Sequence, residues 1–257
     1  MREENARDPG GCTGRGTPDW GVVSVVIPVR NGEEYVREAI ESVVTQTYDR
    51  AQIIVVDDGS EDGSARAVKS FGSRVWYCYQ PWSGAASARN RGVELANGGW
   101  IAFLDADDLW APEKLEKQLL AVAGHDTIDM VFGHVQQFYS PELSDEIRRA
   151  IRIPSQADAG YHVGTLLMKT NTFRRVGAFL PQLRMGEFVE WYARATAAGL
   201  STLMLPDVVM RRRIHANNMG RREQQNRVDY VRALRAGLEE KRRRARHGSW
   251  LSRAKRW

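Results

Sequence analysis

Three carboxylates lie within four positions of the chain, directly after a short apolar segment. Residues 100–104 form that segment, and their length and aromatic content predict a buried strand. Asp105, Asp107 and Asp108 follow it. Clustered carboxylates repel one another unless a cation lies between them, and hard oxygen ligands suit Mg²⁺ or Mn²⁺. The pattern therefore indicates a divalent metal site with room for phosphate oxygens. The alternative is an acidic turn that caps the helix expected after Pro112.

A second acidic pair follows another apolar segment earlier in the chain. Residues 52–56 predict a buried strand, and Asp57 and Asp58 come directly after it. Because right-handed crossovers place the carboxyl ends of parallel strands along one edge, both acidic clusters are expected there. Open α/β sheets bind ligands at that edge. A structural cap does not require two acidic clusters to converge, so their convergence favours a functional site.

Strands and helices alternate in the part of the chain that carries these clusters. Three continuous apolar runs predict buried strands, and two helical patterns separate them; in chain order the elements are 22–27, 33–46, 52–56, 64–71 and 75–79. Asn31 is expected to cap the first helix. Later patterns predict helices and strands at 113–123, 129–139, 164–168, 173–179 and 200–205. The alternation is typical of an α/β fold.

A glycine-containing segment, residues 80–92, lies between the two acidic clusters and opens a helix. Gly84 and small residues stand at the helix start, and Arg89 follows within the helix. Backbone amides at a helix start and an arginine suit a phosphate group or a carboxylate cluster. The alternative is a close contact between helix and sheet, with Arg89 on the surface.

Four sequence blocks together resemble the family 2 glycosyltransferases, enzymes of the GT-A fold that use a nucleotide-diphosphate sugar. In the family's order and at family-like spacing, the blocks are 23–31, 54–60, 88–92 and 103–108. The resemblance covers about residues 20–220 and implies a catalytic domain at 21–220. It implies a Rossmann-like α/β domain with a mixed sheet. It also implies that the sugar is transferred with inversion at its anomeric carbon.

The resemblance implies donor-binding roles for residues in these blocks. Pro28 and Arg30 match the turn that lines the base and ribose of the nucleotide. Asp58 matches the acceptor of a hydrogen bond from the base, usually uracil, so a UDP-sugar is the expected donor. Asp105 would bind the ribose, or the metal through water. Arg89 is assigned to the same donor-binding set.

The resemblance also implies a metal site. Asp107 would ligate the divalent cation directly. Residues 213–218 match an Arg-X-His-X-X-Asn block of the family, in which His215 would be a further ligand. Carboxylates accept either Mg²⁺ or Mn²⁺, and the imidazole favours Mn²⁺. The expected cofactor, Mn²⁺ or Mg²⁺, would neutralise the diphosphate leaving group.

One block departs from the family's pattern, and the departure concerns the catalytic base. The family usually opens this helix with a Glu-Asp pair whose Asp deprotonates the acceptor. Here Glu187 takes the Glu position, and Phe188 replaces the Asp. The base would then be Glu187 or Glu190, which lie on one helical face, and position alone favours Glu187. The alternatives are two solvated glutamates, or an acceptor thiol that needs a weaker base.

Positive charge is concentrated at the C-terminal end. Residues 211–257 contain 16 Lys or Arg and 4 Asp or Glu, whereas the rest of the chain is mildly acidic. A basic helical extension is expected at 221–257, and a disordered leader at 1–20. The extension either packs its apolar stripe on the catalytic domain or contacts an anionic membrane surface or an acidic acceptor. No nucleic-acid motif supports a nucleic-acid partner.

The sequence contains two cysteines and no apolar stretch of the roughly 18–20 residues that cross a membrane. The first residues also lack the apolar segment of a signal peptide. These features favour a cytoplasmic protein, with the basic segment available for contact with the inner face of the membrane.

The sequence therefore predicts a metal-assisted, inverting glycosyltransferase of the hexosyl or N-acetylhexosaminyl class. Its acceptor, a peptide, a small molecule or a lipid-linked sugar, is not identified. A catalytically silent nucleotide-sugar-binding protein is the alternative, and Phe188 favours it. A nucleotidyltransferase is less favoured, because residues 28–32 stand where those enzymes carry a Gly-rich loop with a lysine.

Overall fold

The computed structural model describes residues 20–216 and 218. Residues 1–19 of the expected leader, and the basic extension expected at 221–257, lie outside the described residues. The strands are, in chain order, β1 (Val23–Val29), β2 (Ala51–Asp58), β3 (Val75–Gln80), β4 (Trp100–Phe103), β5 (Leu109–Trp110), β6 (Met130–Tyr139), β7 (Asp158–Gly160), β8 (Leu167–Lys169) and β9 (Thr202–Ile214).

Helices connect most of these strands. They are α1 (Val36–Val44), α2 (Ser64–Lys69), α3 (Ala85–Leu95), α4 (Lys114–Val122), α5 (Asp145–Ala150), α6 (Thr170–Val176) and α7 (Glu187–Ala197), with 3₁₀ turns η1 (Gly72–Arg74) and η2 (Val163–Thr165). Within the described ranges, none of these helices is both long and apolar enough to span a bilayer.

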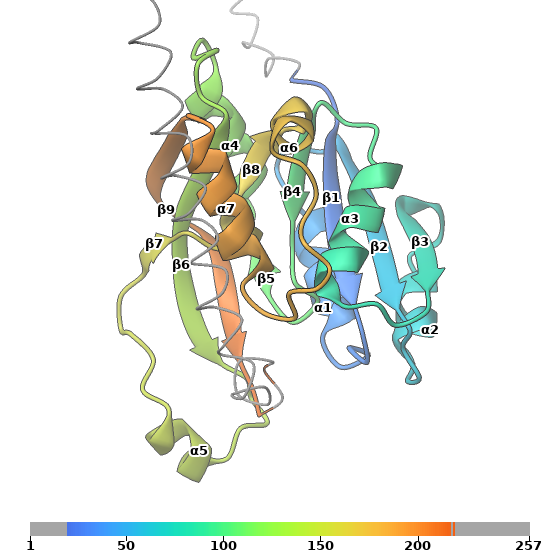
Figure 1. Ribbon diagram of the computed structural model, residues 1–257. Helices are drawn as coiled ribbons and strands as arrows, with labels where there is room; N and C mark the ends of the chain where they lie inside the picture. The colour runs from blue at the N-terminus through green and yellow to red at the C-terminus, as the bar shows by residue number, and fades with distance from the viewer. Residues whose placement is uncertain (1–19, 217, 219–257) are drawn as a thin grey trace, which may run out of the picture.

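The strands form one mixed sheet in the order β3-β2-β1-β4-β8-β6-β9-β5, and β7 pairs with β6. Strand β1 runs parallel to both β2 and β4, and β2 runs parallel to β3. Strand β8 runs antiparallel to β4 and β6, which makes the sheet mixed. The carboxyl ends of β1, β2 and β4 therefore lie side by side (Figure 1). Asp57 and Asp58 are the last residues of β2, and the cluster that begins at Asp105 follows β4, so both acidic clusters lie at this edge.

Helices cover both faces of the sheet. On one face, apolar residues of β1 pack with Ile40 of α1, Val68 of α2 and Leu115 of α4. On the other face, Phe173 of α6 and Trp191 of α7 belong to a second cluster, and Figure 1 shows α3, α6 and α7 in front of the sheet. Strands buried on both faces read as continuous apolar runs, which is why the sequence predicted β1 and β2.

Strand β9 corrects the expectation that the last strand covers residues 200–205. It continues to Ile214, parallel to β6. Pro206 and Asp207 break the apolar run, but the pairing with β6 shifts register next to Gly133 and absorbs them. A bulge is one of the few positions at which a strand accepts proline. The extended strand brings the segment around His215 to the carboxyl edge.

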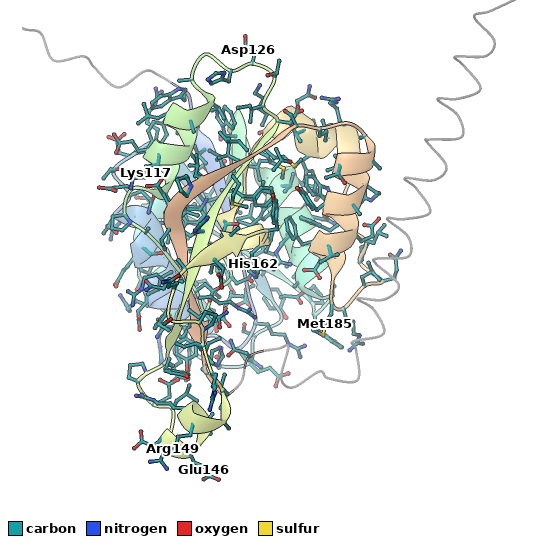
Figure 2. All side chains as sticks on the ribbon, turned by 90° about the vertical axis from the view of Figure 1, so that its left-hand side faces the viewer. Lys117, Asp126, Glu146, Arg149, His162 and Met185 are labelled. Atoms are coloured by element: carbon teal, nitrogen blue, oxygen red, sulfur yellow. The ribbon has the colours of Figure 1, made fainter. Side chains whose placement is uncertain are left out.

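The first turn after β1 also differs from expectation. Helix α1 begins at Val36, and Asn31 does not cap it. Asn31 adopts a left-handed conformation, with φ of 49°, and its side-chain oxygen accepts a hydrogen bond from the Glu61 amide at 2.8 Å. The asparagine thus joins the loops after β1 and β2. Farther along, residues 140–157 leave the body of the domain and carry α5, with Glu146 and Arg149 at the outer end (Figure 2).

Candidate active site

An arginine on α3 connects two carboxylates at the carboxyl edge. Arg89 Nη2 donates to Asp105 Oδ1 at 2.6 Å, and Arg89 Nη1 donates to Glu187 Oε1 at 2.5 Å. Asp105 follows β4, whereas Glu187 is the first residue of α7. The arginine side chain is only 6% exposed. Three elements distant in the sequence are therefore joined by one buried ion-pair chain.

The charges in this chain stabilise one another. Burial is the largest influence on Asp105 and opposes its ionisation. The charge of Arg89, its hydrogen bond and other nearby positive groups together outweigh burial and hold the pKa of the carboxyl below its usual value. Burial likewise opposes the charge on Arg89, but Asp105 and Glu187 raise the pKa of its guanidinium. The sequence placed Arg89 with the donor-binding residues; the structure gives it two carboxylate partners.

Asp107 and His215, the residues predicted to hold a metal, lie in contact. His215 Nε2 is 3.0 Å from Asp107 Oδ2, and Asn218 Nδ2 lies 3.5 Å from the same oxygen. Two adjacent ligands of an octahedral ion, each about 2.1 Å from the metal, are about 3 Å apart. The Asp107 side chain is 34% exposed, so a cation can reach it. The donor set and its spacing fit a hard divalent ion.

Asp108 has a different environment. It is buried and accepts a hydrogen bond from the Arg213 amide at 2.8 Å. Burial, followed by the negative charges of Asp107 and Asp105, raises the pKa of the Asp108 carboxyl well above its usual value. Asp108 therefore ties the acidic turn to β9, and so fixes Asp107 relative to His215.

His162 joins this group, although no sequence motif pointed to it. Its ring and the carboxylates of Asp105 and Asp108 offer ligand atoms that all lie within 4.8 Å of one another. However, His162 Nδ1 accepts a hydrogen bond from the Gly164 amide at 3.1 Å. In a neutral imidazole one nitrogen accepts and the other donates, so Nε2 carries the proton. Burial lowers the pKa of His162, which favours this neutral form. In this tautomer His162 is a hydrogen-bond donor and not a metal ligand.

Asp58, predicted to contact the base, holds the loop between β3 and α3. One oxygen accepts from Gln80 Nε2 and the Ser83 amide, and the other accepts from the Gly84 amide, each at 2.8 Å. A carboxylate has about four acceptor positions, so one remains for a ligand. Because the loop starts α3, Asp58 also fixes the helix that carries Arg89.

Two further residues were predicted to bind the donor: Pro28, near the end of β1, and Arg30, directly after β1. Pro28 is in β1, beside Val56 of β2. The guanidinium of Arg30 lies 4.5 Å from the ring centre of Trp82, and that of Arg184 lies 5.0 Å from it. Trp82 is 51% exposed. Two arginines and an exposed indole thus form a rim beside the Asp58 loop.

The two glutamates predicted as candidate bases have different partners. Glu190 is buried, and its two oxygens accept from Arg194 Nε at 2.7 Å and Nη2 at 3.0 Å. Arg194 also donates to backbone carbonyls that precede α7. Phe188 packs in an aromatic cluster with Phe132 and Trp191. Of these α7 residues, Glu187 is the one bonded to the Arg89–Asp105 pair.

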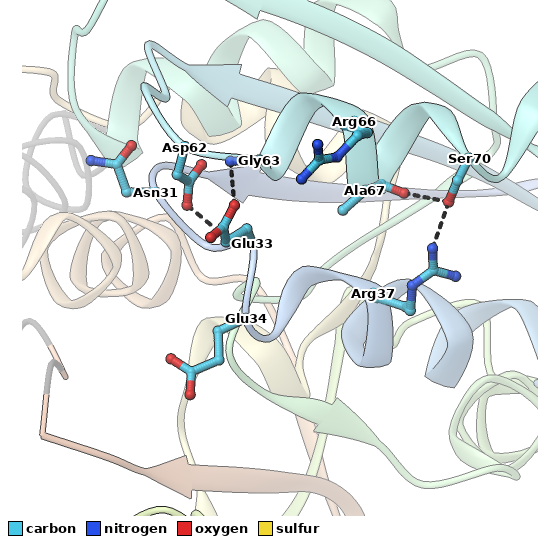
Figure 3. A pocket seen from close by; sticks show the side chains of 9 residues that line it. All are labelled: Asn31, Glu33, Glu34, Arg37, Asp62, Gly63, Arg66, Ala67 and Ser70. Carbon is cyan, nitrogen blue, oxygen red and sulfur yellow. Dashed lines mark hydrogen bonds between the residues drawn. The ribbon is translucent and has the colours of Figure 1, made fainter.

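A polar hollow lies between the start of α1 and one side of α2 (Figure 3). Its groups are paired with one another: Asp62 accepts from the Glu33 amide, Glu33 accepts from the Gly63 amide, and Arg37 donates to Ser70. None of the predicted site residues lines the hollow. These hydrogen bonds join the loops after β1 and β2, and the predicted site residues lie elsewhere, at the carboxyl edge.

Comparison with known proteins agrees with the motifs. Residues 24–184 match the family described as glycosyl transferase family 2. An uncharacterised glycosyltransferase of Rickettsia prowazekii is 31% identical over 212 residues, covering 76% of this chain and 64% of the relative. One of Rickettsia typhi is 34% identical over 179 residues, covering 63% of this chain and 55% of the relative. The chain belongs to glycosyl transferase family 2, and it spans roughly half to two thirds of these two relatives' lengths.

Solved structures share the fold at low sequence identity. TarS of S. aureus, residues 1–349 in complex with UDP-GlcNAc, gives a TM-score of 0.67 at 17% identity, covering 85% of this chain and 66% of that chain. A mannosyltransferase of Pyrobaculum calidifontis, in complex with GDP-Man and Mn²⁺, gives a TM-score of 0.62 at 21% identity, covering 84% and 64%. These similarities confirm the GT-A fold.

Proposed function

We propose that this protein is a metal-assisted, inverting glycosyltransferase that uses a nucleotide-diphosphate sugar. The observation that carries the proposal is a chain of contacts between a possible base and a possible cation site. Glu187 binds Arg89, and Arg89 binds Asp105. Two residues after Asp105, Asp107 contacts His215. A base at one end and a cation site at the other are what displacement of a diphosphate requires. Family membership supports the same reaction class.

The donor lies along the carboxyl edge in this proposal. Asp107 and His215 would hold Mn²⁺ or Mg²⁺, which would supply positive charge to the diphosphate leaving group. The open acceptor position of Asp58 takes a hydrogen bond from the base, beside Pro28 and Arg30. A UDP-sugar is the first donor to test, because a solved neighbour binds UDP-GlcNAc; another neighbour binds GDP-Man.

Glu187 is the proposed base. Its carboxylate takes the acceptor proton as the acceptor attacks the anomeric carbon on the side opposite the diphosphate, which inverts the configuration. Arg89 holds the carboxylate in place through their ion pair. Glu190 does not take this role in the proposal, because Arg194 occupies both of its oxygens.

The test is release of nucleoside diphosphate from a panel of UDP-sugars and GDP-Man in the presence of Mn²⁺. Release from one donor, abolished by chelation and strongly reduced in Glu187→Gln, supports the proposal. No release from any donor, with the nucleotide still bound, supports the catalytically silent binder. Phe188 favours that alternative, because it leaves α7 without the usual second acid.

The basic segment gives a further part of the proposal. Residues 211–257 carry a strong positive charge, and contact with the inner, anionic face of the membrane is proposed for them. Co-sedimentation with vesicles containing phosphatidylglycerol, compared with neutral vesicles and with added salt, tests this contact. Equal binding to both kinds of vesicle contradicts an electrostatic interaction and, with it, the proposed cytoplasmic membrane surface.

A further inference from the structure

His162 occupies a central position that the family motifs do not account for. Figure 2 shows it near the middle of the molecule, between Asp126 at one end and Arg149 at the other. A ring nitrogen of His162 lies within 4.8 Å of carboxylate oxygens of Asp105 and Asp108. It lies just before η2, the turn that follows β7.

The orientation of the ring is set by its own backbone. Nδ1 accepts from the Gly164 amide two residues farther on, the pattern by which an asparagine closes an Asx turn. Nε2–H is therefore the nitrogen left for a ligand, and among the described residues it has no hydrogen-bond partner. Thr165 Oγ1 donates to the His162 carbonyl at 2.8 Å and closes the turn.

Buried side chains from the segment after the acidic cluster hold this turn. Trp110 Nε1 donates to the Gly164 carbonyl at 2.9 Å, and Gln118 Nε2 donates to the Thr165 carbonyl at 2.7 Å. Lys114 Nζ lies 3.4 Å from the Leu166 carbonyl. The carbonyls of the three consecutive residues 164–166, at the end of η2, are thus bound by side chains of β5 and α4, the elements that follow the acidic cluster. The distance between His162 and Asp105 is fixed by this carbonyl clamp.

The place of His162 relative to the proposed reaction follows from its neighbours. Inverting displacement requires the transferred sugar to lie between the leaving diphosphate and the base. Asp105 lies between these two points, because it is two residues from Asp107 and bonds through Arg89 to Glu187. The ion-paired carboxylates of Asp105 and Glu187 only accept hydrogen bonds, and the two Arg89 groups that face them are already paired.

We propose that the Nε2–H of His162 donates a hydrogen bond to a hydroxyl or carbonyl oxygen of the transferred sugar, and so contributes to the choice and orientation of the donor. This inference rests on the proposed function. It assigns His162 to the sugar and not to the metal or the diphosphate. The carbonyl clamp of Trp110, Lys114 and Gln118 positions it.

Two substitutions test the roles of the two ring nitrogens separately. In His162→Asn, the side-chain oxygen still accepts from the Gly164 amide, but the side chain is too short to reach the position of Nε2. Gln in His162→Gln places its amide donor near that position. Calorimetry in the presence of Mn²⁺ then measures the affinity for each nucleoside diphosphate and for its sugar nucleotides. UDP is compared with UDP-Glc, UDP-Gal and UDP-GlcNAc, and GDP is compared with GDP-Man. The sugar nucleotide that wild type binds more tightly than its diphosphate is the probe.

The expected result is that His162→Asn weakens the sugar nucleotide about tenfold, or about 1.4 kcal/mol, and leaves the diphosphate within about twofold. His162→Gln retains most of the wild-type difference. Equal weakening of both ligands would assign His162 to the metal or diphosphate and overturn the inference, as would unchanged affinities or no sugar-dependent gain in wild type. Wild type that binds no nucleotide at all would instead overturn the proposed function.

Discussion

Glu187 and Glu190 lie three positions apart on α7, but they have different hydrogen-bond partners and therefore different roles. Glu187 is bonded to Arg89, which also binds Asp105 at the carboxyl edge, whereas Glu190 is held by Arg194 of the same helix. Sequence alone could not separate them, because the deciding partner of Glu187 is 98 residues away. The same is true of His162, whose neighbours Asp105 and Asp108 come from another loop.

Glu187→Gln and Glu190→Gln are expected to differ in turnover. The first removes the proposed base and lowers turnover of the folded protein about 10²- to 10⁴-fold; because it also weakens the buried ion pair with Arg89, it lowers the free energy of unfolding by about 1–3 kcal/mol. The second weakens a buried ion pair and lowers the free energy of unfolding by about 1–3 kcal/mol, with turnover of the folded protein retained. Donor turnover and urea denaturation of both variants measure this. Loss of turnover in Glu190→Gln alone would reverse the assignment.

The elements show which parts of the fold a sequence can specify. Strands β1 and β2 are covered on both faces, so their continuous apolar runs predicted them. The second half of β9 was missed because Pro206 and Asp207 interrupt its pattern, and the bulge that accepts them depends on the pairing with β6. The role of Asp58 in holding the loop before α3 likewise depends on a pairing of strands that sequence alone could not show.

Gly84 starts α3 with φ of 94° and ψ of 158°, a conformation close to exclusive to glycine. Gly84→Ala is therefore expected to destabilise the protein by about 1–3 kcal/mol through backbone strain alone, since nothing lies within 4 Å of the added Cβ. It should also weaken nucleotide binding, because the start of α3 sets Arg89. Gly99→Ala is the matched control: its Cβ also meets nothing within 4 Å, and its φ is not in the left-handed region. Urea denaturation that shows equal stability for both variants would contradict this account.

Lys114 on α4 is buried, and its amine donates hydrogen bonds to Gln118 Oε1 and to the carbonyls of Thr165 and Leu166. Burial holds the pKa of this amine well below its usual value. The unfolded chain then binds one more proton than the folded chain at every pH between the lowered pKa and about 10.5. Wild-type stability should rise with pH across that window. Lys114→Met removes the titrating group, so its stability should rise less steeply. Urea denaturation at pH 7, 8.5 and 10 checks this, and parallel curves for the two proteins would mean that Lys114 titrates normally.

At the scale of the whole molecule, the functional residues come from both halves of one mixed sheet. One half is the parallel set β3-β2-β1-β4, and the other contains β8, β6, β9 and β5. The parallel half supplies Asp58, Asp105 and Asp107, and His215 directly follows β9 of the other half. The pairing of β5 with β9 and the bond from Asp108 to the Arg213 amide join the halves. The site is thus a product of the complete sheet.

The most direct test of the central claim is calorimetric titration of UDP, and of GDP, into the full chain with and without Mn²⁺. The same titration is made into Asp107→Asn and into Asp145→Asn, a control on the outlying helix α5. We expect binding of one nucleotide that requires Mn²⁺ in wild type and in Asp145→Asn, and at least a tenfold loss in Asp107→Asn. Binding that is independent of Mn²⁺, or is unaffected by Asp107→Asn, would contradict a metal-assisted nucleotide site at this edge of the sheet.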